Sequence, residues 1–277
     1  MNTISTKRER NVKEEEYIQP ILTQLYKLLG YQVKRITKTE DQLRGADIQL
    51  SKQGVTIIAD EKGDFGERQL YIGQTNDSED DFGNKDSGIT FCQEKSFLYQ
   101  GENQLIVRIN GWNHEEARTR ALNSHYIFVW MYKERDPETE ELTRVRLMEV
   151  MLIPCDAIDE IIHNAWKRDG LEYPGDKAFI EAVLKKIKDK GWENQDITNV
   201  EYHPGVKVCY LGASYEEKPI NFNVYKAYLR KYAVWNYACV CRGETGKEKI
   251  VALRQLGRNV PDEEYKAGFI PVAEFKR

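Results

Sequence analysis

Apolar residues recur at helical spacing near the start of the chain and then alternate along short runs that are typical of strands. The spacing predicts a helix over residues 17–29 that is ended by Gly30. Its apolar side consists of Ile18, Ile21, Leu22, Leu25, Leu28 and Leu29. Pro20 fits only in the first turn of such a helix. Three strand-like runs follow, at 31–36, 46–50 and 55–62.

The second part of the pattern begins with a polar, glycine-punctuated stretch, 63–88, which we interpret as an exposed loop. After it the periodicity predicts that the sheet continues, with helices at 89–99 and 114–122 and strands at 104–109 and 125–132. A strand at 144–154 and helices at 157–166 and 178–191 come next.

From about residue 201 onward, short runs containing Tyr and Gly indicate strands around a helix within 223–237. The whole pattern predicts an α/β fold with a central mixed sheet flanked by helices, followed by a C-terminal α+β extension. The best candidate for a boundary divides the chain into 1–170 and 171–277, although a single domain is also compatible with the pattern.

Composition agrees with a globular protein, because 40% of the 277 residues are apolar and 31% are charged with both signs mixed. The longest apolar runs, 126–132 and 150–153, are much shorter than the roughly 18 to 20 residues of a membrane helix. The first residues are charged and resemble no signal peptide. Five scattered cysteines suit a reducing compartment. We therefore expect a cytoplasmic protein without a membrane span.

The net charge of −4 hides an uneven distribution. Residues 205–277 hold 13 Lys or Arg against 8 Asp or Glu, together with eleven aromatic residues. Bases and tyrosines alternate in NVYKAYLRKYAVWNY (223–237), a mixture that can hold a phosphate backbone and stack on bases. The same spacing equally describes an amphipathic helix with a basic outer face.

Candidate chemistry lies in the hairpin GADIQLSKQGVTIIADEKGDF (45–65), where Asp47 is near the start of one strand and Asp60-x-Lys62 near the end of the next. Side chains alternate along a strand, so Asp60 and Lys62 share one face and Glu61 lies on the other. Two converging carboxylates form a hard oxygen site that suits Mg²⁺. Such a metal stabilises charge on a scissile phosphate and activates water, and Lys62 can position that water.

An acidic residue, any residue and Lys form a common triplet, and Glu274-x-Lys276 also follows an apolar run, with Pro261-Asp262 ahead of it. The residues after Asp262 do not resemble a strand, whereas Asp60-x-Lys62 has a hydrophobic strand before it and an acidic residue on the neighbouring strand. The context favours the first site over the second.

The order of helix, three strands, helix and strand, together with Asp47, Asp60 and Lys62, resembles the PD-(D/E)xK nuclease superfamily and its restriction-endonuclease-like core. The resemblance covers about residues 12–132. It implies that the two acids bind Mg²⁺ and that the lysine assists catalysis. Ala46 stands in place of the proline of the motif name, and the second acid is Asp where Glu is commoner.

Many members of that superfamily add a metal ligand from the first helix, a role that the resemblance assigns to Glu16 within the run Glu14, Glu15, Glu16. Three glutamates near a helix N-terminus are also explained by the helix dipole. Glu61, on the opposite face of its strand, is expected to form an ion pair instead.

A nuclease core with a large remainder resembles a type II restriction endonuclease, which implies double-stranded DNA as substrate and a homodimer. The alternatives are a repair or junction-resolving nuclease, an inactive nuclease-like DNA-binding protein, and an α/β protein with an accidental triplet. Candidate phosphate contacts are the basic residues near the site and in the tyrosine-rich segment: Lys34, Arg35, Lys38, Arg44, Lys226, Arg230 and Lys231.

Overall fold

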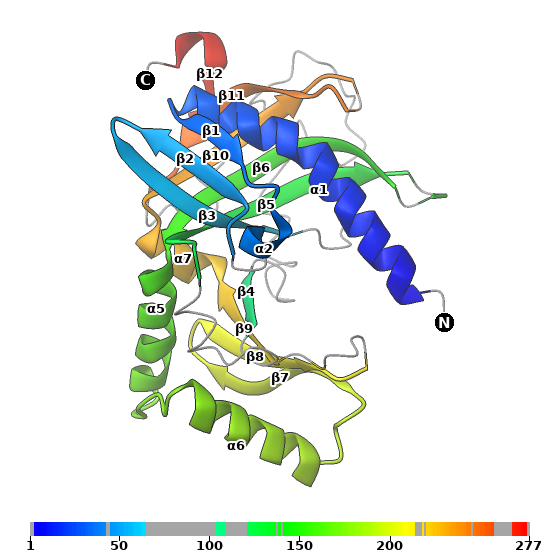
Figure 1. Ribbon diagram of the computed structural model, residues 1–277, viewed down its shortest axis with the longest axis vertical. Coiled ribbons are helices and arrows are strands. Elements are labelled where there is room, and N and C mark those ends of the chain that lie inside the picture. The colour runs from blue at the N-terminus through cyan, green and yellow to red at the C-terminus, as the bar shows by residue number, and fades with distance from the viewer. Residues whose placement is uncertain are drawn as a thin grey trace.

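A computed structural model of the chain describes residues 3–42, 45–64, 104–108, 121–136, 138–139, 141–213, 218, 220–244, 246–257 and 268–275. Within these residues the protein is an α/β structure with two sheets, a large mixed one of eight strands and an antiparallel one of four (Figure 1). Helices flank the large sheet, as the sequence predicts.

The first helix, α1 (Thr3–Leu28), starts much earlier than residue 17, and Pro20 lies in its interior. The expectation that Pro20 belongs to the first turn is therefore wrong. Residues 3–16 are rich in Lys, Arg and Glu, which favour helix without needing an apolar side. Pro20 offers no N–H to the carbonyl of Glu16. Both residues are exposed, so water can satisfy that carbonyl.

The large sheet has the order β1-β2-β3-β5-β6-β10-β11-β12. Its strands are β1 (Gln32–Arg35), β2 (Ile48–Lys52), β3 (Val55–Asp64), β5 (His125–Arg135), β6 (Leu142–Pro154), β10 (Trp235–Arg242), β11 (Lys249–Gln255) and β12 (Ile270–Pro271). All neighbours are antiparallel except β3 and β5, which run parallel. The predicted strands at 31–36, 46–50, 55–62, 125–132 and 144–154 are confirmed. Short helices, α2 (Thr39–Gln42) and η3 (Val272–Glu274), lie between β1 and β2 and after β12.

Each face of the large sheet packs against a different hydrophobic layer. Along β6, Met148, Val150 and Leu152 belong to the cluster that includes α1. The alternate residues, Met151 and Ile153 among them, belong to a second cluster on the opposite face. The central strands are therefore buried on both sides, with α1 lying across one side only (Figure 1).

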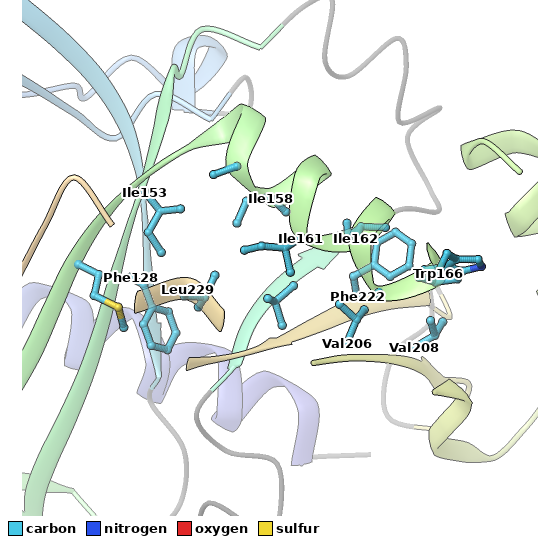
Figure 2. Packing of buried hydrophobic residues seen from close by; sticks show 14 of the residues in the cluster. Phe128, Ile153, Ile158, Ile161, Ile162, Trp166, Val206, Val208, Phe222 and Leu229 are labelled. Atoms are coloured by element: carbon cyan, nitrogen blue, oxygen red, sulfur yellow. The ribbon is translucent and has the colours of Figure 1, made fainter. Parts of the chain in front are cut away.

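The second face is covered by helices α5 (Cys155–Arg168) and α7 (Lys226–Tyr232) and by the four-stranded sheet. Figure 2 shows Phe128 and Ile153 of the large sheet near Leu229 of α7 and Ile158 of α5, while Phe222 and Val206 of the smaller sheet lie farther along α5 near Trp166. Helix α6 (Asp176–Asp189) packs on the same cluster through Phe179, Val183 and Ile187. The predicted helices at 157–166 and 178–191 are confirmed.

The smaller sheet has the order β4-β9-β8-β7, formed by β4 (Gln104–Arg108), β9 (Ile220–Tyr225), β8 (Val206–Leu211) and β7 (Asp196–His203). The strand predicted at 104–109 exists as β4, but it pairs with β9 and does not continue the central sheet. The predicted loop 63–88 lies outside the described residues except for Gly63 and Asp64, which extend β3. The predicted helix at 89–99 lies wholly outside them. The helix at 114–122 also lies outside them except for its last two residues, which are not helical.

The boundary proposed between residues 170 and 171 does not coincide with the division into sheets. Strand β10 pairs with β6, and β11 and β12 extend the large sheet from there. The C-terminal part of the chain thus contributes to both sheets.

A buried ion pair fixes α7 on the large sheet. Arg230, 7% exposed, donates from Nε and Nη2 to the two carboxylate oxygens of Glu149 on β6 at 2.9 and 3.0 Å. The Asn236 side chain donates to the same carboxylate at 2.8 Å. The helix within 223–237 is only seven residues long, and Arg230 is on its inner side. Its predicted role in DNA binding is therefore wrong, because Glu149 neutralises its charge inside the protein.

We expect Arg230→Met to lower the free energy of unfolding by about 3–5 kcal/mol, because it leaves the Glu149 carboxylate buried without a counter-charge. The double variant Glu149→Gln/Arg230→Met removes that charge and keeps an acceptor for Asn236, so it should recover most of the loss. Urea denaturation of both variants measures this difference. Equal stability of Arg230→Met and the wild type would contradict the assignment.

Candidate active site

Asp47 directly precedes β2 and lies next to the segment of β3 that carries Asp60. The last register pair at this end of the ladder is Ile48 with Ala59, and the Asp47 N–H also donates to the Ala59 carbonyl at 3.1 Å, so Asp47 lies beside the Ala59–Asp60 peptide. The structure thus places Asp47 next to the strand segment that carries Asp60.

Asp60 lies on the face of the sheet that α1 does not cover. Ile48 and Ala59, which neighbour Asp47 and Asp60 in sequence, are fully buried in the α1 cluster. Asp60 is 9% exposed and is in parallel register with Tyr126, which packs on the second cluster. The Asp60 carboxylate therefore faces the side of α5 and the smaller sheet.

The Asp47 carboxylate also has a local structural partner. Its Oδ2 accepts a hydrogen bond from the Glu61 N–H at 2.9 Å, at the point where β2 no longer offers a carbonyl to β3. This bond ties the carboxylate to the backbone of the strand that carries Asp60. A charged acceptor makes such a bond stronger than a neutral one.

The segment leading to Asp47 approaches the start of β5 closely. Gly45 has φ +76°, and a Cβ there would lie 2.5 Å from Asn123 Oδ1, so a larger residue would displace Asn123. The Ser124 N–H donates to the Ile58 carbonyl at 2.9 Å. Asn123 and Ser124 therefore border the site from the β5 side. Sequence reasoning missed Gly45 and Asn123, and the glycine two residues before Asp47 was the available signal.

Glu61 forms the expected ion pair on the opposite face. Its carboxylate accepts hydrogen bonds from Tyr26 on α1 at 2.5 Å and from Arg35 on β1. Burial raises the pKa of the Glu61 carboxyl, while the adjacent Arg35 guanidinium acts in the opposite direction. Burial and the adjacent Glu61 raise the pKa of the Tyr26 phenol. Arg35 is thus engaged inside the structure, and its predicted contact with phosphate is not supported.

Lys62 lies two residues after Asp60 within β3 and is paired through its backbone register with Phe128. Its side chain lies outside the described part of the structure. Its catalytic role stays a prediction.

Glu16 is not brought to this pair. It is exposed on α1, which covers the opposite face of the sheet. Its neighbour Tyr17 donates to Glu248 and lies 3.3 Å from the Thr143 carbonyl, beside β11 and β6. In the described residues no three His, Cys, Asp or Glu side chains gather as a metal-binding group.

The other predicted phosphate contacts have different surroundings. Lys34, Lys38 and Lys231 are exposed, and Lys38 is 3.9 Å from Asp41. Arg44 and the side chain of Lys226 lie outside the described residues.

The competing C-terminal triplet has little structural context. Glu274 is exposed in η3, after the two-residue strand β12 at the edge of the sheet. Asp262 and Lys276 lie outside the described residues. Asp47 and Asp60, on two paired strands, remain the better candidate.

No family model, curated protein or solved structure matches this chain. The function is therefore inferred from the residues and strands described above. Among the helices in the described ranges, none has both the length and the apolar character needed to cross a membrane.

Two substitutions at Asp47 separate its structural role from its charge. Asp47→Ala removes the acceptor of the Glu61 N–H and should lower the free energy of unfolding by about 1–2 kcal/mol. Asp47→Asn keeps an acceptor oxygen and should stay close to the wild type. Urea denaturation compares the three proteins, and an Asp47→Ala variant as stable as Asp47→Asn would count against the hydrogen bond.

Proposed function

We propose that this protein is a Mg²⁺-dependent endonuclease that hydrolyses phosphodiester bonds of DNA. The observation that carries the proposal is the position of Asp47 beside the segment of β3 that carries Asp60, where the Asp47 N–H donates to the Ala59 carbonyl and its carboxylate accepts from the Glu61 N–H. The order α1, β1, β2, β3 and then β5 beside β3 also agrees with the core of the PD-(D/E)xK superfamily that the sequence resembles. This order supports the proposal without identifying a relative.

The two carboxylates have the donor chemistry that Mg²⁺ requires. Asp47 and Asp60 offer hard oxygen ligands from adjacent strands, and Mg²⁺ in proteins is often held by one or two carboxylates while it keeps several waters. Mg²⁺ bound there would supply charge stabilisation at the scissile phosphate and a more acidic attacking water.

The surrounding residues hold this pair in place. The Glu61 N–H orients the Asp47 carboxylate, and the Glu61 side chain secures β3 from the other face through Tyr26 and Arg35. Lys62, expected from strand alternation to share the face of Asp60, would position the water or stabilise the charged transition state.

Within this class we favour a type II restriction endonuclease acting on double-stranded DNA as a homodimer. This choice rests on the resemblance and on the amount of chain beyond the core. One alternative, with the same chemistry, is a repair or junction-resolving nuclease. The other is a catalytically inactive, nuclease-like protein that binds DNA and does not cleave it.

The test is cleavage of unmethylated phage DNA in Mg²⁺ by the wild type and by Asp47→Asn, Asp60→Asn and Lys62→Ala. Each substitution should reduce the rate by about 100-fold or more, because it removes a metal ligand or the lysine. EDTA should abolish cleavage by the wild type. Calorimetric titration with Mg²⁺ and Mn²⁺ should show that Asp60→Asn loses metal binding, whatever the substrate.

Glu274→Gln and Lys276→Ala are the matched controls, since they remove the same types of charge from the competing triplet. Both should cleave and bind metal like the wild type. Loss of activity in these controls would move the active site to the C-terminus. Absence of metal binding to the wild type would contradict the proposal.

A further inference from the structure

A cluster of cations and tyrosines forms on the surface where α5, α7 and the smaller sheet meet. It consists of Arg168 at the end of α5, Lys207 on β8, Tyr225 at the end of β9, and Tyr228 and Lys231 on α7. We call these five residues the cation–tyrosine surface. Arg168 and Lys231 are exposed, and the other three are partly exposed.

The tyrosine rings position the cations. The Arg168 guanidinium carbon lies 4.9 Å from the centroid of the Tyr228 ring, and its Nη1 donates to the Tyr228 hydroxyl at 2.7 Å. The Lys231 Nζ is 5.0 Å from the same centroid, and the Lys207 Nζ is 5.7 Å from that of Tyr225. Cations in such positions are attracted to the ring and keep their full charge.

Carboxylates do not neutralise these cations within the described part of the chain. None of the ion pairs found there involves Arg168, Lys207 or Lys231; among the nearer ones, Lys186 pairs with Glu201, Arg230 with Glu149 and His203 with Asp169. Asp169, the residue after Arg168, has its carboxylate hydrogen-bonded to His203. The surface therefore retains three positive charges that can meet an anion.

The geometry suits phosphates better than bases. A Cβ on Gly205, which has φ +86°, would lie 2.4 Å from the Tyr228 ring, so the ring packs directly on that turn. The same ring has two cations near it, which leaves little of it for a nucleobase. The tyrosines thus act as supports for cations, and the stacking on bases considered from the sequence is not needed.

Helix α5 links this surface to the candidate active site. Cys155, its first residue, contacts Asn123 at the border of the site, and Arg168 is its last residue. Fourteen residues of α-helix span about 20 Å, or roughly six base pairs of duplex. The surface and Asp60 are also on the same side of the large sheet, the side opposite α1.

We infer that the cation–tyrosine surface binds the sugar-phosphate backbone of duplex DNA outside the cleavage site, an inference that rests on the proposed function. Arg168, Lys207 and Lys231 contact phosphates, and Tyr225 and Tyr228 hold them in position. Contacts of this kind give affinity without sequence preference and weaken steeply with salt.

The test is binding of a fluorescently labelled duplex about 30 base pairs long, some three helical turns, followed by anisotropy in EDTA. The wild type is compared with Arg168→Gln/Lys207→Gln/Lys231→Gln between about 50 and 200 mM salt. Affinity falls with salt, and each phosphate contact adds about 0.9 to the steepness of log affinity against log salt. The slope of the triple variant should therefore be shallower than that of the wild type by about 2 to 3. Its affinity at the lowest salt should fall by about tenfold or more.

The matched control is Lys185→Gln/Lys188→Gln/Lys190→Gln, which removes the same charge from exposed positions of α6 and its C-terminus. Its slope should equal that of the wild type. A wild-type slope in the surface variant, or an equal loss in both triple variants, would overturn the inference.

Measurement in EDTA keeps this result separate from the proposed catalysis. If the wild type cleaves DNA and the surface variant binds normally, the surface inference fails and the nuclease stands. If no protein cleaves DNA but the surface variant alone has a shallower slope, the proposed nuclease activity fails and DNA binding by the cation–tyrosine surface is supported.

Discussion

The large sheet is covered on both faces, and this double burial constrains every strand within it. Successive residues of β6 point to opposite faces, so one set packs on the layer that contains α1 and the other set on the layer that contains α5. A charge in such a strand needs a partner within reach, and Glu149 has Arg230 and Asn236. Helix α7, which covers this face of the sheet, is thus also attached to β6 by the ion pair of Arg230 with Glu149.

Double burial explains the different surroundings of neighbouring carboxylates on β3. Asp60 and Glu61 are adjacent, but alternation sends them to opposite faces. Glu61 meets Tyr26 and Arg35 beneath α1, while Asp60 points to the face of α5 and the smaller sheet. A shift of one residue in the register of β3 would turn Glu61 to the face of the candidate site and Asp60 to the face beneath α1.

The sequence predicts most of the strands because apolar runs and turns are local signals. It also predicts the hairpin with Asp47 and Asp60, since both strands and their turn are contiguous. It does not predict that β4 pairs with β9, because an apolar run carries no information about its partner more than 100 residues away. Nor does it show which base in KAYLRKY turns inward. Arg230 turns inward because Glu149 accepts its hydrogen bonds, and Glu149 is 81 positions away in the sequence.

The start of α1 was missed for a different reason. Its first half has helical propensity but no apolar side, so periodicity gives no signal there. In the candidate site, the approach of Gly45 to Asn123 joins segments on either side of a long intervening stretch. Contacts of this kind depend on the completed sheet and not on local pattern.

The return of the chain to the large sheet has a consequence for its biogenesis. Strand β6 lies between β5 and β10, and about 80 residues separate the end of β6 from the start of β10. During synthesis the β6 edge stays open until β10 has left the ribosome, while α5, α6 and the smaller sheet are being made. An open, apolar edge is a template for pairing with other chains. Rapid docking of β10, helped by the attraction between Arg230 and Glu149, would close that edge and limit aggregation of the nascent protein.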